Sequence, residues 1–112
     1  MIVEDSEDTA AAVANVLGVE HEVGCAGEGD EALSCAVGFV PEVVFVDLTL
    51  PGISGFEVAR RLRNLFGKSV RLIAFTGNAI GAVHAKAAGF DDLIQKPASM
   101  ERLLYAAASQ AD

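Results

Sequence analysis

The chain has 112 residues, with sixteen acidic side chains against eight Lys and Arg and a net charge of −8. A chain of this length forms one domain that buries roughly 65% of its unfolded surface, which excludes a multi-domain arrangement of these residues. Because hydrophobic residues make up 52% of the chain, intrinsic disorder is excluded as well. The negative charge is opposite to what a nucleic-acid backbone attracts, so we expect no direct nucleic-acid partner.

The sequence also argues against a membrane location and a cysteine-based site. No apolar run approaches the roughly 20 residues of a membrane span, and the acidic Glu4-Asp5 pair is the wrong flank for a signal peptide. We therefore expect a cytoplasmic protein with no membrane partner. Cys25 and Cys35 lack a second pair of ligands to complete a metal site, and we interpret them as buried, reduced packing residues.

Hydrophobic runs of strand length alternate with helix-length patterns along the whole chain. The third and fourth runs are the clearest strands, because they are continuous and rich in β-branched residues. The predicted strands cover residues 1–3, 22–26, 43–46, 70–75 and 93–94. The predicted helices cover residues 10–17, 31–37, 56–66, 79–88 and about 99–108, with N-caps at Ser6, Ser54 and Ser99 and stops at Gly18, Gly38, Gly67 and Gly89.

This order is a βα unit repeated five times, which predicts an α/β fold of the doubly wound class. Right-handed crossovers place the helices on both faces of a parallel five-stranded sheet. In such folds ligands bind outside the carboxyl ends of the strands. The candidate functional residues should therefore be sought where the strands end.

Four of the predicted strands end in polar residues. Glu4-Asp5 follows the first strand, Asp47 the third, Thr76 the fourth and Lys96 the fifth. Each residue alone has an ordinary explanation, as a helix cap, a turn residue or a solvated charge. Together they indicate a reactive site, because the doubly wound topology brings all these ends to one edge of the sheet.

The chain resembles the receiver domain of two-component response regulators. The matching segments are VEDSED, FVDLTLPGISGFEVARRLR, LIAFTGN and AAGFDDLIQKP, in the order of the family and over essentially all of residues 1–112. The resemblance implies a flavodoxin-like strand order of 2-1-3-4-5 and a cis peptide bond before Pro97. It also assigns the site residues: Asp47 as phosphoacceptor, Glu4 and Asp5 as the Mg²⁺ pair, Thr49 as a carbonyl ligand, and Thr76 and Lys96 as groups that meet the phosphoryl oxygens.

Elementary chemistry favours the same roles. The carboxylates of Glu4, Asp5 and Asp47 carry three negative charges at neighbouring strand ends, and Lys96 reduces the sum to −2. One Mg²⁺ would balance this remainder, and Mg²⁺ prefers oxygen ligands and retained waters. The function expected from the resemblance is transfer of a phosphoryl group from a phosphohistidine onto Asp47, followed by a conformational signal. The domain would catalyse its own phosphorylation and dephosphorylation without being a stand-alone enzyme.

The expected partner is a sensor histidine kinase or a histidine phosphotransfer protein, with an output domain or partner protein elsewhere. The sequence departs from the family at Leu93, where an aromatic residue is usual, so we expect a weaker conformational switch. The LIAFTGN segment is most similar to receivers of hybrid histidine kinases, with a single-domain regulator as the alternative. The first strand is short for a central strand, and the sequence leaves open whether its start is truncated.

Other functions fit these residues less well. A dehalogenase-type phosphatase needs a second Asp where Thr49 stands, and a flavin site would be repelled by Glu4-Asp5. A degenerate receiver that binds partners without phosphorylation remains the alternative. We interpret His21 and His84 as solvated or packing residues, and the basic run at residues 60–63 as a solvated face.

Overall fold

The computed structural model describes residues 1–19, 21–77, 84–85 and 88–108. Its strands are β1 (Ile2–Val3), β2 (Cys25–Ala26), β3 (Val43–Asp47), β4 (Arg71–Thr76) and β5 (Asp92–Gln95). Its helices are α1 (Glu7–Leu17), α2 (Gly29–Phe39), α3 (Gly55–Phe66) and α5 (Met100–Ala108), with a 3₁₀ turn, η1 (Gly67–Ser69), after α3. None of the described helices has the length and hydropathy needed to cross a membrane.

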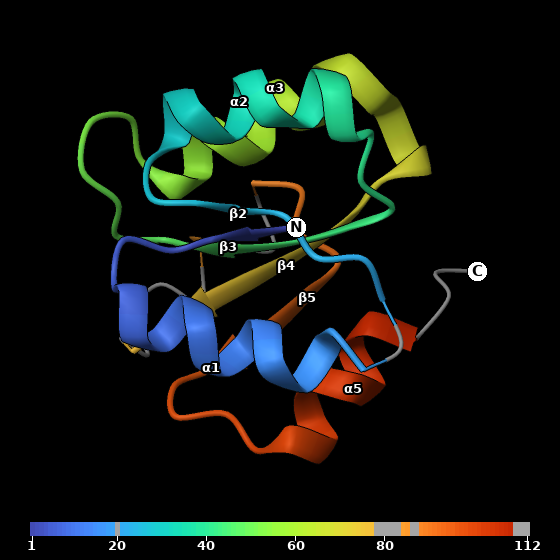
Figure 1. Ribbon diagram of the computed structural model, residues 1–112. Coiled ribbons are helices and arrows are strands. Elements are labelled where there is room, and N and C mark those ends of the chain that lie inside the picture. Colours follow the sequence, from blue (N-terminus) through green and yellow to red (C-terminus); the bar gives the residue numbers. More distant parts are fainter. Residues whose placement is uncertain (20, 78–83, 86–87, 109–112) are drawn as a thin grey trace.

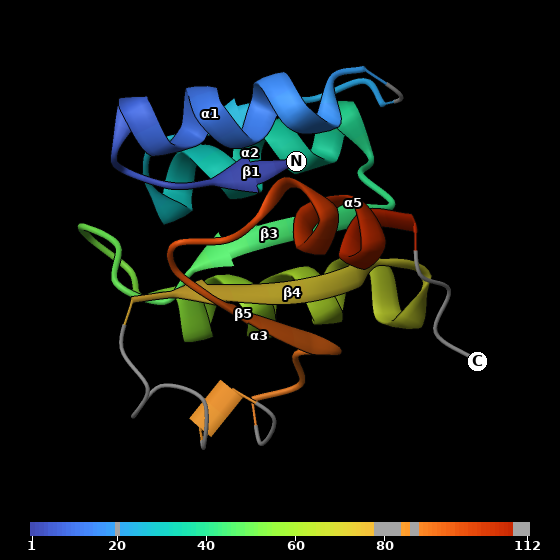
Figure 2. The same ribbon diagram turned by 90° about the horizontal axis from the view of Figure 1, so that it is seen from below.

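The five strands form one parallel sheet in the order β2-β1-β3-β4-β5, which confirms the predicted fold class and strand order. Figure 2 shows β1, β3, β4 and β5 succeeding one another across the sheet. The register pairs Val3 with Val46 and Asp47 with Phe75. The residues that follow β1 and β4 therefore lie on either side of the carboxyl end of β3.

Helices cover both faces of the sheet, with α2 and α3 on one face and α1 and α5 on the other (Figure 1). Alternation along β3 divides its side chains between two cores. Val44 and Val46 pack in the core beneath α2 and α3, whereas Phe45 packs in the core beneath α1 and α5. All three are at most 1% exposed, as expected for a central strand covered on both faces.

Serine residues begin three of the helices as predicted. Each accepts a hydrogen bond from the backbone amide three residues later, at 3.3 Å for Ser6, 3.2 Å for Ser54 and 3.1 Å for Ser99. These bonds satisfy amides that have no partner inside the helix. The serine caps thus fix where α1, α3 and α5 begin after the strands that precede them.

Several expectations about local structure were wrong. α2 does not stop at Gly38 but continues to Phe39 and ends at Val40, which takes the left-handed conformation with φ of 49°. Cys25 and Cys35 are exposed free thiols, not buried packing residues, because Cys25 faces outward on the edge strand β2 and Cys35 lies on the outer side of α2. The predicted helix at 79–88 lies largely outside the described residues.

The basic run on α3 is only partly a solvated face. Arg60 and Arg61 both donate hydrogen bonds to the Glu57 carboxylate. Arg63 instead reaches across to the start of β5, where it donates to the Gly89 carbonyl at 2.7 Å and the Asp91 carboxylate at 3.0 Å. Its guanidinium therefore ties the end of α3 to the segment before β5.

Candidate functional site

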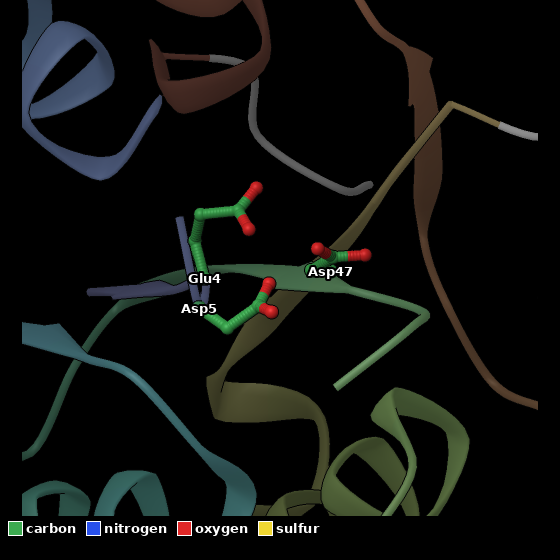
Figure 3. A group of neighbouring side chains, drawn as sticks. All are labelled: Glu4, Asp5 and Asp47. Carbon is green, nitrogen blue, oxygen red and sulfur yellow. The ribbon is translucent and has the colours of Figure 1, made fainter. Parts of the chain in front are cut away.

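Three acidic side chains meet at the carboxyl ends of β1 and β3. Glu4 and Asp5 directly follow β1, and Asp47 is the last residue of the neighbouring strand β3. One carboxylate oxygen from each lies within 4.8 Å of the others. Figure 3 shows the three side chains extending toward a shared space at the sheet edge. Glu4 is 3% exposed and Asp47 6%, while Asp5 is open to solvent.

Lys96 supplies the positive charge at this cluster. Its Nζ forms an ion pair with Glu4 and lies 3.2 Å from Asp47 Oδ2. Its backbone amide donates to the Thr76 carbonyl at 2.8 Å, and the following Lys96-Pro97 peptide bond is cis, as predicted. The ammonium thus bridges two of the three carboxylates.

Backbone amides hold the two buried carboxylates in place. The Ser6 amide donates to Glu4 Oε2 at 3.1 Å, and the Thr49 amide donates to Asp47 Oδ1 at 2.9 Å. Each carboxylate is therefore held through one oxygen by the chain that follows it and through the other by Lys96. This fixes their orientation before any ligand binds.

The electrostatics of the cluster follow from burial and pairing. Burial raises the pKa of Glu4, aided by the neighbouring Asp47 and opposed by the hydrogen bond from Lys96. Burial works against the charged form of Lys96, but its hydrogen bonds to Glu4 and Asp47 prevail and raise the pKa of Lys96. Three carboxylates and one ammonium leave a charge of −2 when all are ionised. Oxygen ligands with this charge suit a hard divalent cation.

The remaining predicted site residues lie around the cluster. Thr76 ends β4 and is 2% exposed, one residue beyond Phe75, which pairs with Asp47 in the sheet. Thr49 is exposed in the segment after β3. Leu93 is half-buried on β5 and packs against the core beneath α2 and α3. In a conformational switch we expect Thr76 to move the loop Gly77-Asn78-Ala79 with it, and of this loop only Gly77 lies in the described part of the chain.

His21 and His84, which we interpreted as solvated or packing residues, are both exposed. Phe75 was missed by the sequence reasoning, which treated it only as a core residue. Its ring centroid lies 5.0 Å from Lys96 Nζ, a cation–π contact that supports the ammonium from the α1 and α5 side. Strand alternation in the sequence shows only that residue 75 faces away from residues 74 and 76, and the contact itself depends on how β4 packs against the segment after β5.

The family model of the response regulator receiver domain matches residues 1–108. Among curated relatives, the DNA-binding response regulator MtrA of Mycobacterium tuberculosis is 30% identical over 105 residues, which cover 93% of this chain and 46% of that protein. The sensory transduction protein LytT of Oceanobacillus iheyensis is 33% identical over 110 residues, covering 95% of this chain and 45% of that protein. The chain thus spans about half the length of the curated relatives it matches.

Solved structures show the same fold. A putative response regulator from Chloroflexus aurantiacus superposes with a TM-score of 0.86 at 30% identity, covering 93% of this chain and 88% of that chain. The receiver domain of NtrX from Brucella abortus gives a TM-score of 0.85 at 28% identity, covering 92% and 89%. With the acidic cluster at the expected sheet edge and the family model matched over nearly its full length, the chain belongs to the response regulator receiver domains of two-component systems.

Proposed function

We propose that residues 1–112 form a single receiver domain that accepts a phosphoryl group on Asp47. The observation that carries this assignment is the environment of Asp47. Its carboxylate ends the central strand β3, accepts from the Thr49 amide through Oδ1 and faces the Lys96 ammonium through Oδ2, beside two further acids. A carboxylate held this way is oriented for attack.

The phosphodonor in this proposal is a phosphohistidine of a sensor histidine kinase or a histidine phosphotransfer protein. An Asp47 carboxylate oxygen forms a bond to phosphorus while the bond from phosphorus to the imidazole nitrogen breaks, and the electron pair stays on the imidazole. The products are an aspartyl phosphate and an unmodified histidine. Lys96 and the Thr76 hydroxyl are the donors we assign to the phosphoryl oxygens.

Glu4, Asp5 and Asp47, together with the Thr49 carbonyl, are the groups that we assign to Mg²⁺. A bound Mg²⁺ supplies positive charge that offsets the charge on the phosphoryl oxygens. The residues fit this ion because they offer oxygen ligands and an excess charge of −2. Autocatalysis then needs no further residue: the same groups that orient Asp47 for attack also orient the aspartyl phosphate for hydrolysis by water.

A partner would approach over a groove beside the site. A cavity of about 560 Å³ opens between α1 and the start of α5, with Lys96 at one end and an apolar lining that includes Val16, Phe75, Met100 and Leu103. We assign this groove to the phosphodonor protein, which would meet the domain in the cytoplasm. The name of the MtrA relative records DNA binding for that protein; an output of this kind would belong to another part of the assembly.

Treatment with acetyl phosphate and Mg²⁺ tests the proposal. Intact-mass analysis should show one phosphoryl adduct on the wild-type chain and none on Asp47→Asn. Asp30→Asn is the matched control, since Asp30 is an exposed acid on α2, and it should retain the adduct. A wild-type chain that stays unmodified would support the degenerate receiver instead. An adduct that persists in Asp47→Asn would refute the assignment of the residue.

A further inference from the structure

Gly55, the first residue of α3, lies directly against the backbone that carries Asp47. A Cβ atom at Gly55 would stand 2.2 Å from the Asp47 carbonyl oxygen and 2.8 Å from Leu48 Cα. Cβ atoms in proteins essentially never come within 3.0 Å of another heavy atom. The start of α3 can therefore occupy its position only because residue 55 has no side chain.

We infer that Gly55 is a positioning residue for the acidic site: its missing side chain lets α3 hold the end of β3, and with it the Asp47 carboxylate and the Leu48-Thr49 peptide, in place. This inference rests on the proposed function. Two hydrogen bonds link these segments. The Gly55 amide donates to the Leu48 carbonyl at 3.4 Å, and the Thr49 amide donates to Asp47 Oδ1 at 2.9 Å.

A side chain at position 55 would displace the backbone that carries Asp47, and not merely the end of a flexible side chain. The atoms that it would meet are backbone atoms, which cannot turn away as the end of a side chain can. β3 itself is fixed by pairing with β1 on one side and β4 on the other. The shift must therefore fall on α3 and on the peptide that joins Leu48 to Thr49, which holds Asp47 Oδ1.

Two other glycines in helices provide an internal comparison. A Cβ at Gly29, the first residue of α2, would lie 2.3 Å from Ile53 Cγ1 and 2.7 Å from Val58 Cγ2, which are side-chain atoms. A Cβ at Gly38, near the end of α2, would meet nothing within 4 Å. An added Cβ would thus meet backbone atoms at Gly55, side-chain atoms at Gly29 and open space at Gly38. Of the three glycines, only Gly55 lies against Asp47.

The test compares Gly55→Ala, Gly29→Ala and Gly38→Ala by Mg²⁺ titration at a temperature where each is folded. Because displaced supports of a metal site typically cost 10- to 100-fold in affinity, we expect the Kd for Mg²⁺ to rise about tenfold or more in Gly55→Ala. The Kd should change less than about twofold in the other two variants. The amide NMR shift of Thr49 should move in metal-free Gly55→Ala, a change that loss of stability alone does not cause.

An unchanged Kd and an unchanged Thr49 shift in Gly55→Ala would overturn the inference, and so would an equal loss of affinity in Gly29→Ala. If Gly55→Ala does not fold, it is repeated in a background carrying Gly38→Ala and Val40→Gly, both expected to stabilise α2. Failure to fold there as well would assign the glycine to folding alone and also overturn the inference.

A wild-type chain that binds no Mg²⁺ and takes no phosphoryl group would contradict the proposed function. A wild type with normal Mg²⁺ binding and phosphorylation, together with a Gly55→Ala variant that binds Mg²⁺ equally well, would contradict only the inference.

Discussion

Val40 adopts a backbone conformation that valine seldom takes. It ends α2 with φ of 49° and ψ of 71°, it is β-branched, and it precedes Pro41. The left-handed region costs an L-residue roughly 1–2 kcal/mol, and a following proline restricts the backbone further. Its side chain is 60% exposed, so little packing compensates for this strain.

We therefore expect Val40→Gly to stabilise the domain by about 1 kcal/mol, since glycine enters the left-handed region without the steric penalty. Thermal unfolding should show a rise in Tm of roughly 4 °C. The control is Val37→Gly, an exposed valine inside the same helix, which should lower Tm because glycine weakens a helix interior. A lower Tm in Val40→Gly would show that the conformation at residue 40 is not strained.

Glu4 should make the metal-free domain less stable as pH rises. Its pKa is raised above the ordinary 4.5 by burial, so between 4.5 and the raised pKa the folded chain binds more protons than the unfolded chain. The contribution of Glu4 to the free energy of unfolding must then fall as pH increases through this window. Urea unfolding in EDTA between about pH 4.5 and 7 should show this fall, and Glu4→Gln should reduce it.

The Met1 ammonium acts partly in the same range: burial lowers its pKa to about 6, so its contribution to stability rises between about pH 6 and its ordinary 8.0 in wild type and Glu4→Gln alike. Two further groups with shifted pKa values act in separate pH windows. The pKa of Glu57 is lowered to about 2 by its hydrogen bonds to Arg60 and Arg61, so its contribution is lost only as pH falls below the ordinary 4.5. The pKa of Lys96 is raised, so its contribution is lost only above its ordinary 10.5. A slope between pH 4.5 and 7 that is identical in wild type and Glu4→Gln would therefore rule out Glu4 as its source.

The elements that were predicted well are those with a strong local signal. β3 and β4 are continuous buried runs, and the serine caps of α1, α3 and α5 are short-range features that need no tertiary context. β1 and β2 contain only two residues each and owe their strand geometry to pairing with neighbours. α2 continues past Gly38 because Val40, not the glycine, takes the left-handed position at its end.

The candidate site likewise has features that the sequence predicts and features that depend on tertiary packing. The polar strand ends at Glu4, Asp5 and Asp47 could be found from the sequence, because parallel topology brings such ends together. The support of Lys96 by Phe75 depends on where two distant segments pack. The close approach of Gly55 to Asp47 likewise depends on how α3 docks, and the sequence marks that position only as the residue after a helix cap.

On the scale of the whole molecule, the fold gathers charge of one sign at one edge of the sheet. The chain carries a net charge of −8, and its acidic cluster holds −2 after Lys96 is counted. Repulsion among these carboxylates lowers the stability of the folded state, where they are close, more than that of the unfolded state. A cation that binds only the folded state should reverse this loss.

Mg²⁺ should therefore stabilise the domain through Asp5, the exposed member of the cluster. At a free concentration ten times its Kd, the ion adds about 1.4 kcal/mol to the free energy of unfolding, or roughly 5 °C in Tm. Asp5→Asn should raise Tm without metal, because it removes one of three crowded charges, and should abolish most of the rise with Mg²⁺. The control is Glu42→Gln, which removes an exposed acid just before β3, at the amino ends of the strands and away from the cluster. This variant should keep the full rise. Melts at matched ionic strength with NaCl separate site binding from general screening, and a Mg²⁺ response that survives Asp5→Asn would place the ion elsewhere.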